Sequence, residues 1–64
     1  MKRVHELKDK GRYLDALKRL GKLILEKTQK DNSDIVMLSS IAGTESNVLA
    51  RDMLDDFIEK IDEK

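Results

Sequence analysis

Residues 12–29, RYLDALKRLGKLILEKTQ, have the pattern of an amphipathic helix. The apolar side chains recur every three or four positions, so at 100° per residue they share one helical face. They are Tyr13, Ala16, Leu17, Leu20, Leu23 and Ile24. The opposite face carries Arg12, Asp15, Lys18, Arg19, Lys22 and Glu26. We therefore predict a helix over residues 12–29 whose apolar face is covered by other helices.

Two glycines mark structural positions in this half of the chain. Gly11 is expected to end a shorter helix over residues 2–10, because glycine can supply the left-handed conformation of a C-cap. Gly21 lies inside the long helix, where glycine costs about 1 kcal/mol relative to alanine. A close helix crossing at Gly21 is one explanation, and an ordinary tolerated glycine is the other.

A third helix is expected after the polar turn at residues 30–33, running to about Ala42. Asn32 or Ser33 can cap it, since both types accept hydrogen bonds from the first turn. The Ile-Val-Met-Leu run at residues 35–38 is apolar on all sides of this helix. Either the helix is buried on two sides, or part of it faces a partner.

The last helix is expected to follow Thr44, which caps it with Glu45 just inside. Its apolar face is wide and comprises Leu49, Ala50, Met53, Leu54, Phe57, Ile58 and Ile61. The simplest arrangement is all-α, with about four short helices packed around one core in a single domain over residues 1–64. A helical hairpin with a long C-terminal helix is the alternative.

Length and composition limit the class of protein. A chain of 64 residues buries only about 60% of its unfolded surface, so its stability margin is thin. It has no cysteine, which fits a reducing compartment. The longest apolar run, residues 35–38, is too short to span a bilayer. No apolar stretch follows the basic N-terminus, so we expect no signal peptide and a cytoplasmic protein.

Charge is sorted along the chain. Residues 1–30 hold ten Lys and Arg against four acids, a net charge of +6, and residues 31–64 hold three against nine, a net charge of −6. The formal total is zero, yet the two halves of the chain are oppositely charged. This separation favours binding to a protein partner or to a second copy of the chain.

Eight residues are the candidate protein-binding sites. We call Arg12, Lys18, Arg19 and Lys22 the basic face. We call Asp52, Asp55, Asp56 and Glu59 the acidic stripe, because they recur at i, i+3, i+4 and i+7 on one side of the last helix. The basic face of one copy is expected to meet the acidic stripe of another copy or of a related domain. Such a contact is heterologous, and Met37 or Phe57 could add apolar area to it.

We expect no catalysis, cofactor or metal site. His5 is the only histidine, and no spacing identifies a nucleophile or an orienting group for it, so we predict a surface histidine. The acidic stripe lacks the glycine-containing loop of a Ca²⁺ site, which favours a solvated or protein-docking surface. We expect no small-molecule substrate and no membrane partner.

Several segments resemble the bacterial effector-associated domains. Residues 4–7, 11–12 and 16–23 are similar to the opening hairpin of that family. Residues 32–40, NSDIVMLSS, are similar to a family segment that ends in Leu-Ser-Ser, and residues 54–58, LDDFI, resemble its closing helix. The resemblance implies a small helical adaptor, comparable with death-fold modules. It further implies that the module joins like with like in bacterial conflict and defence systems. It transfers no specific site residue.

Three other functions or arrangements remain open. A small regulator or inhibitor could bind a larger enzyme through an apolar helix face, in which case Met37→Asp or Leu54→Asp would abolish binding. Nucleic-acid binding is less favoured, because Asp15 and Glu26 interrupt the basic face and the acidic half would repel a phosphate backbone. Finally, the opposite charges could pack against one another inside one monomer.

Overall fold

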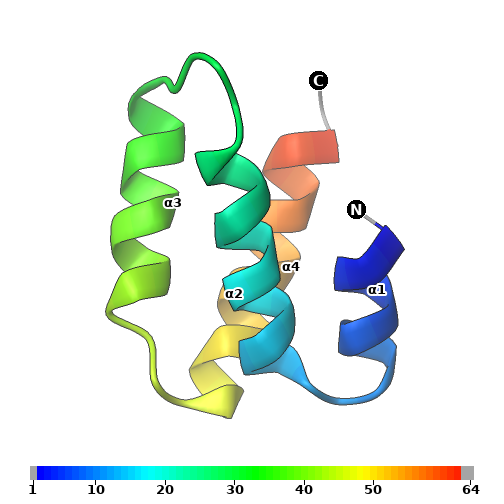
Figure 1. Ribbon diagram of the computed structural model, residues 1–64. Coiled ribbons are helices and arrows are strands. Elements are labelled where there is room, and N and C mark those ends of the chain that lie inside the picture. The colour runs from blue at the N-terminus through cyan, green and yellow to red at the C-terminus, as the bar shows by residue number, and fades with distance from the viewer. Residues whose placement is uncertain (1, 63–64) are drawn as a thin grey trace.

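The computed structural model describes residues 2–62, and four helices connected by short turns make up this part of the chain (Figure 1). They are α1 (Lys2–Asp9), α2 (Tyr13–Leu25), α3 (Asn32–Ala42) and α4 (Asn47–Asp62). The expectation of an all-α bundle of about four short helices is confirmed.

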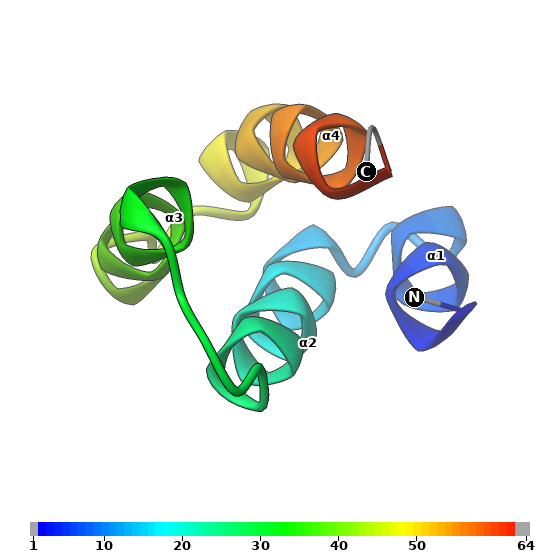
Figure 2. The same cartoon turned by 90° about the horizontal axis from the view of Figure 1, so that it is seen from above.

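Helix α2 lies at the centre of the arrangement and packs against each of the other three helices (Figure 2). This position follows from its sequence, since Leu17, Leu20 and Ile24 recur at helical spacing and are all but fully buried. The core is completed by residues from all four helices. Its buried members are Val4, Leu7, Ala16, Leu17, Leu20, Ile24, Met37, Ala50, Leu54, Phe57 and Ile58.

The prediction for Gly11 is confirmed, and the structure decides between the two explanations left open for Gly21. Gly11 ends α1 with φ at 78°, the left-handed region in which a side chain is strained. Gly21 is buried where α2 crosses α3. A Cβ at this position would lie 3.3 Å from both Cδ1 and Cγ2 of Ile41. The glycine at position 21 is therefore explained by a close helix crossing.

The connection from α2 to α3 differs from the prediction. Helix α2 ends at Leu25, four residues before the expected end at residue 29. Residues 26–29 are polar, so no burial holds them in the helix. Asp31, and neither Asn32 nor Ser33, caps α3, because its side chain accepts from Asp34 N at 2.9 Å. Asp34 Oδ2 in turn accepts from Asp31 N at 3.3 Å, which completes a capping box.

Asp34 also forms a partly buried ion pair with Lys27, which lies in the connection from α2 to α3. The Asp34 side chain is 2% exposed, and its Oδ2 lies 2.9 Å from Nζ of Lys27. Lys27 lies beyond the end of α2, in the connection to α3, and its side chain extends from there to the Asp34 carboxylate. The Asp34 carboxylate therefore takes part in the capping box of α3 and also binds the connection between α2 and α3 through Lys27.

The start of α4 also differs from the prediction. Helix α4 begins at Asn47, and Ser46 occupies the position before it, whereas Thr44 does not cap the helix. Thr44 is buried instead. Its hydroxyl donates to Ser40 O at 2.7 Å and lies 3.1 Å from Met53 Sδ. Packing against Met53 holds Thr44 between α3 and α4, so the cap falls two residues later.

Asn47 ties the first turn of α4 to the connection between α1 and α2. Its Nδ2 donates to Gly11 O at 3.3 Å, and its Oδ1 accepts from Leu14 N at 3.0 Å. These bonds satisfy backbone groups near the start of α2 that lack partners within that helix. They also fix where α4 lies along α2.

Candidate protein-binding faces

All four cations of the basic face are exposed. Three of them lie on α2, whose apolar side is buried in the core, so these three occupy its solvent-facing side. Arg12, just before α2, is engaged within the copy, since its Nη2 lies 2.6 Å from Asp15 Oδ2. Among the described side chains, no ion pair involves Lys18, Arg19 or Lys22.

All four acids of the acidic stripe are exposed on α4. Asp55 lies at the edge that faces α1, and its Oδ1 lies 2.6 Å from Nζ of Lys8. Within the part of the chain that the structure describes, Asp52, Asp56 and Glu59 form no ion pair. Three carboxylates therefore remain available on the outer side of α4.

The basic face and the acidic stripe point to opposite sides of the bundle. Helices α2 and α4 pack against each other through their apolar sides, so their charged sides face outward in opposite directions (Figure 2). No ion pair joins the two surfaces among the described side chains. One residue of each surface pairs within the copy, Arg12 with Asp15 and Asp55 with Lys8, and neither pair joins the two surfaces.

The apolar residues expected to assist docking are in the core. Met37 is 3% exposed and Phe57 7% exposed, so neither can contact a partner while the bundle is folded. Leu54 is fully buried as well. The Met37→Asp and Leu54→Asp substitutions would consequently test folding, and the prediction that these residues belong to a docking surface is wrong.

Other large apolar residues are exposed instead. They are Leu25 at 61%, Ile35 at 52%, Val36 at 63%, Val48 at 71% and Leu49 at 58%. The all-apolar run at residues 35–38 indicated that some of its side chains would be exposed, since a helix cannot bury all its sides against one neighbour. Ile35 and Val36 are the exposed members of this run. Leu49 was expected in the core, but it lies at the margin of the wide apolar side of α4 and turns outward.

A shallow pocket of about 280 Å³ lies between the C-terminal halves of α2 and α4. Its lining is apolar except for one residue, and comprises Leu20, Leu23, Ile24, Lys27 and Ile61. The Lys27 ammonium donates to Asp34, so this pocket contains no set of polar groups arranged for chemistry.

One histidine and several carboxylates lie outside these faces. His5 is exposed, as predicted for a surface histidine. Over the described residues, no group of three or more His, Cys, Asp or Glu side chains is arranged to hold a metal ion. No helix within residues 2–62 combines the length and apolar content needed to cross a membrane.

Comparison of this chain with family models, with curated proteins and with solved structures finds no match. The resemblance to effector-associated domains therefore stays a prediction.

Proposed function

We propose that this chain is a non-catalytic protein–protein interaction module that assembles through its basic face and its acidic stripe. The partner is a second copy or a related domain. The observation that carries the proposal is the opposite orientation of the two surfaces. Arg19 and Lys22 cannot reach Asp52 or Asp56 of the same molecule, because the folded core separates α2's outer side from that of α4.

Charge explains how such a module would select its partner. A single exposed ion pair contributes about 0–1 kcal/mol, so several pairs have to act together. Complementary potentials also raise the association rate and disfavour partners of the wrong sign. Because the two surfaces differ, each copy can use both at once, and a heterologous contact of this kind builds rings or open chains.

The proposed setting follows from the sequence. The cysteine-free composition fits a reducing compartment, so we place the module in the cytoplasm. The resemblance to effector-associated domains supports an adaptor role in a bacterial conflict, defence or signalling system. In that role the module would bring larger effectors together.

Sedimentation at two salt concentrations tests the proposal. We expect self-association, or binding to a related domain, at about 0.1 M salt and its loss at about 1 M, where the Debye length falls to about 3 Å. Arg19→Glu or Asp56→Lys alone should weaken association. Both substitutions in one chain should restore it in part, because the attraction is then reversed. Lys2→Glu, at an exposed site on α1, is the matched control. A monomer under every condition, with unchanged partner binding, would contradict the proposal.

A second candidate function is favoured by the exposure of Ile35 and Val36 on α3. A small regulator could bind a larger enzyme through these side chains. Its binding would survive high salt and fail on Val36→Asp, whereas assembly through the charged faces would show the reverse behaviour.

A further inference from the structure

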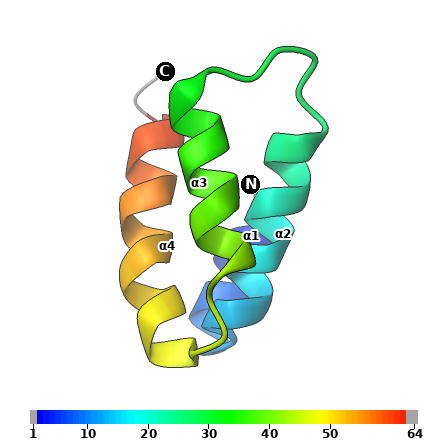
Figure 3. The same cartoon turned by 90° about the vertical axis from the view of Figure 1, so that its left-hand side faces the viewer.

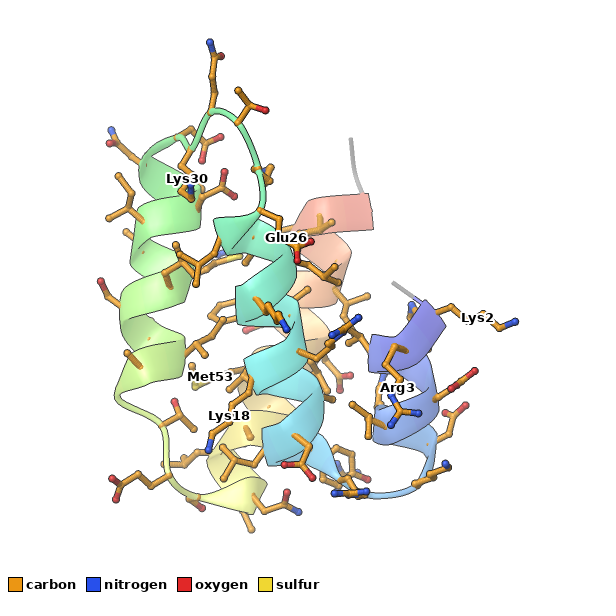
Figure 4. All side chains as sticks on the ribbon, viewed as in Figure 1. Lys2, Arg3, Lys18, Glu26, Lys30 and Met53 are labelled. Carbon is orange, nitrogen blue, oxygen red and sulfur yellow. The ribbon has the colours of Figure 1, made fainter. Side chains whose placement is uncertain are left out.

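Exposed apolar residues lie beside the charges of the basic face. On α2, Lys18, Lys22 and Leu25 recur at i, i+4 and i+7, so they form one stripe along the helix. Leu25 lies one turn beyond Gly21, which touches α3, and this places the stripe on the α3 side of α2. Figure 4 shows the Lys18 side chain extending from α2 toward that side. The stripe therefore combines cations with an apolar residue that is 61% exposed.

Helix α3 continues this surface. Ile41 of α3 contacts α2 at Gly21, and Asp34 of α3 pairs with Lys27 just beyond the end of α2. Leu38 lies one turn from each of these two residues, so it shares their side of α3. Ile35 precedes Leu38 by one turn and is 52% exposed. Figure 3 shows α3 between α4 on one side and α2 on the other. We call the surface formed by Lys18, Lys22, Leu25, Ile35 and Leu38 the α2–α3 seam.

The outer side of α4 has the matching composition. Val48 and Leu49 are 71% and 58% exposed in its first turn. Val48 precedes Asp52 by four residues, and Leu49 precedes Asp56 by seven, so the apolar pair and these acids share one side of the helix. An apolar end followed by carboxylates is the complement of a seam that combines apolar residues with ammonium groups.

We propose that α4 of one copy docks into the α2–α3 seam of a second copy. Val48 and Leu49 would contact Leu25 and Ile35, and Asp52 and Asp56 would face the two lysines of the seam. This inference rests on the proposed function and names its partner and its apolar anchors.

Charge and geometry together select a second copy docked head to tail. Two seams facing each other would bring Lys18 and Lys22 against the same lysines, and two α4 surfaces would bring carboxylates together, so a symmetric pairing through either surface is disfavoured. Within one molecule, α4 cannot reach the seam, because its outer side points away from α2 (Figure 2). Among the described side chains, this one contact accounts for four of the five large apolar residues that are exposed.

Two double variants, one for each of the two surfaces that meet, test the proposed contact. Val48→Ser with Leu49→Ser blocks the α4 surface, and Leu25→Ser with Ile35→Ser blocks the seam. None of the four changes alters the charge. All four residues are more than half exposed, so the fold should persist, and far-UV circular dichroism with urea unfolding checks this. Val36→Ser removes an equally exposed apolar group outside both surfaces and is the matched control.

We expect each blocked variant to lose about tenfold or more in self-association measured by sedimentation at low salt. A mixture of the two blocked variants should form a heterodimer that grows no further, because one intact α4 surface meets one intact seam. The control should associate like the unmodified chain. A mixture that stays monomeric overturns the inference.

Other outcomes separate this inference from the function on which it rests. Blocked variants that associate like the unmodified chain, while Arg19→Glu and Asp56→Lys do not, overturn the inference and leave assembly through charge standing. Equal loss in the Val36→Ser control also overturns it. If the unmodified chain is monomeric at millimolar concentration but binds a related domain in a salt-dependent way, the second copy is the wrong partner and only the inference falls.

Discussion

Gly21 of α2 and Ile41 of α3 lie so close that a Cβ on residue 21 would come within 3.3 Å of two side-chain carbons of Ile41. Helix propensity favours alanine over glycine by about 1 kcal/mol, whereas overpacking costs a similar amount or more. These two effects oppose each other at this position. The balance depends on how far the Ile41 side chain can move.

Gly21→Ala is therefore expected to leave the free energy of unfolding within about 1 kcal/mol of its original value. In an Ile41→Ala background, where both close carbons are absent, the same substitution should stabilise the protein by about 1 kcal/mol. A double-mutant cycle measured by urea unfolding gives the coupling. Equal effects of Gly21→Ala in the two backgrounds would show that the contact is not tight.

Lys27→Met removes the cation that pairs with the buried Asp34 carboxylate. Breaking a fully buried pair costs about 3–5 kcal/mol. The Lys27 side chain is 37% exposed, so water screens part of the interaction, and we expect a loss of about 2 kcal/mol. Lys22→Met, at an exposed site on α2, should change stability by less than about 0.5 kcal/mol. Equal losses in the two variants, measured by thermal and urea unfolding, would argue against a structural role for the pair.

Asn47→Ala removes the two hydrogen bonds that hold the start of α4 against Gly11 and Leu14. Each bond contributes about 0.5–1.5 kcal/mol, so we expect a combined loss of about 1–3 kcal/mol in the free energy of unfolding. Asn47→Asp keeps the acceptor for Leu14 N and should lose less. Asn32→Ala, at an exposed position of α3, is the control, and a loss of similar size there would point to a general effect of removing asparagine.

Lys8→Ala frees the carboxylate of Asp55. The side chain of Lys8 is 35% exposed and that of Asp55 57%, so water screens the pair and stability should change by less than about 1 kcal/mol. The acidic stripe becomes more negative, and binding to a basic partner should tighten at low salt. Lys2→Ala changes the net charge equally without touching the stripe. Sedimentation that shows the same shift for both variants would assign the effect to net charge alone.

The helices and most of the core could be predicted because they depend on local spacing. Leu17, Leu20 and Ile24 fall on one helical face whatever lies elsewhere in the chain. Gly11 could be assigned to a C-cap for the same reason, since the left-handed conformation favours glycine at the end of a helix. These signals are contained within a few consecutive residues.

The helix ends could not be predicted, because they depend on contacts between distant residues. Thr44 and Ser46 are both suitable caps by type, and only the position of Met53 decides that Thr44 is buried. Likewise, the contact of Lys27 with Asp34 forms outside α2, between two residues that no sequence pattern brings together. A single sequence contains no measure of these distances.

The candidate site was predictable in part. The exposure of Arg19, Lys22, Asp52 and Asp56 follows from the charged sides of amphipathic helices. The pairing of Lys8 with Asp55 required knowing that α1 lies beside α4. Leu25 and Val48, which we propose as apolar docking contacts, were not predicted. A single apolar residue on the polar side of a helix produces no periodic pattern.

Helix α3 contributes only Asp34 and Met37 to the buried interior, and it packs chiefly on α2. Its amide protons should exchange with solvent sooner than those of α2, because opening this helix exposes little apolar surface. The seam in which we place a second copy is thus formed partly by a helix that should exchange sooner than α2. Occupancy of the seam would slow deuterium uptake across residues 32–42, which gives a direct measure of assembly at each position along the helix.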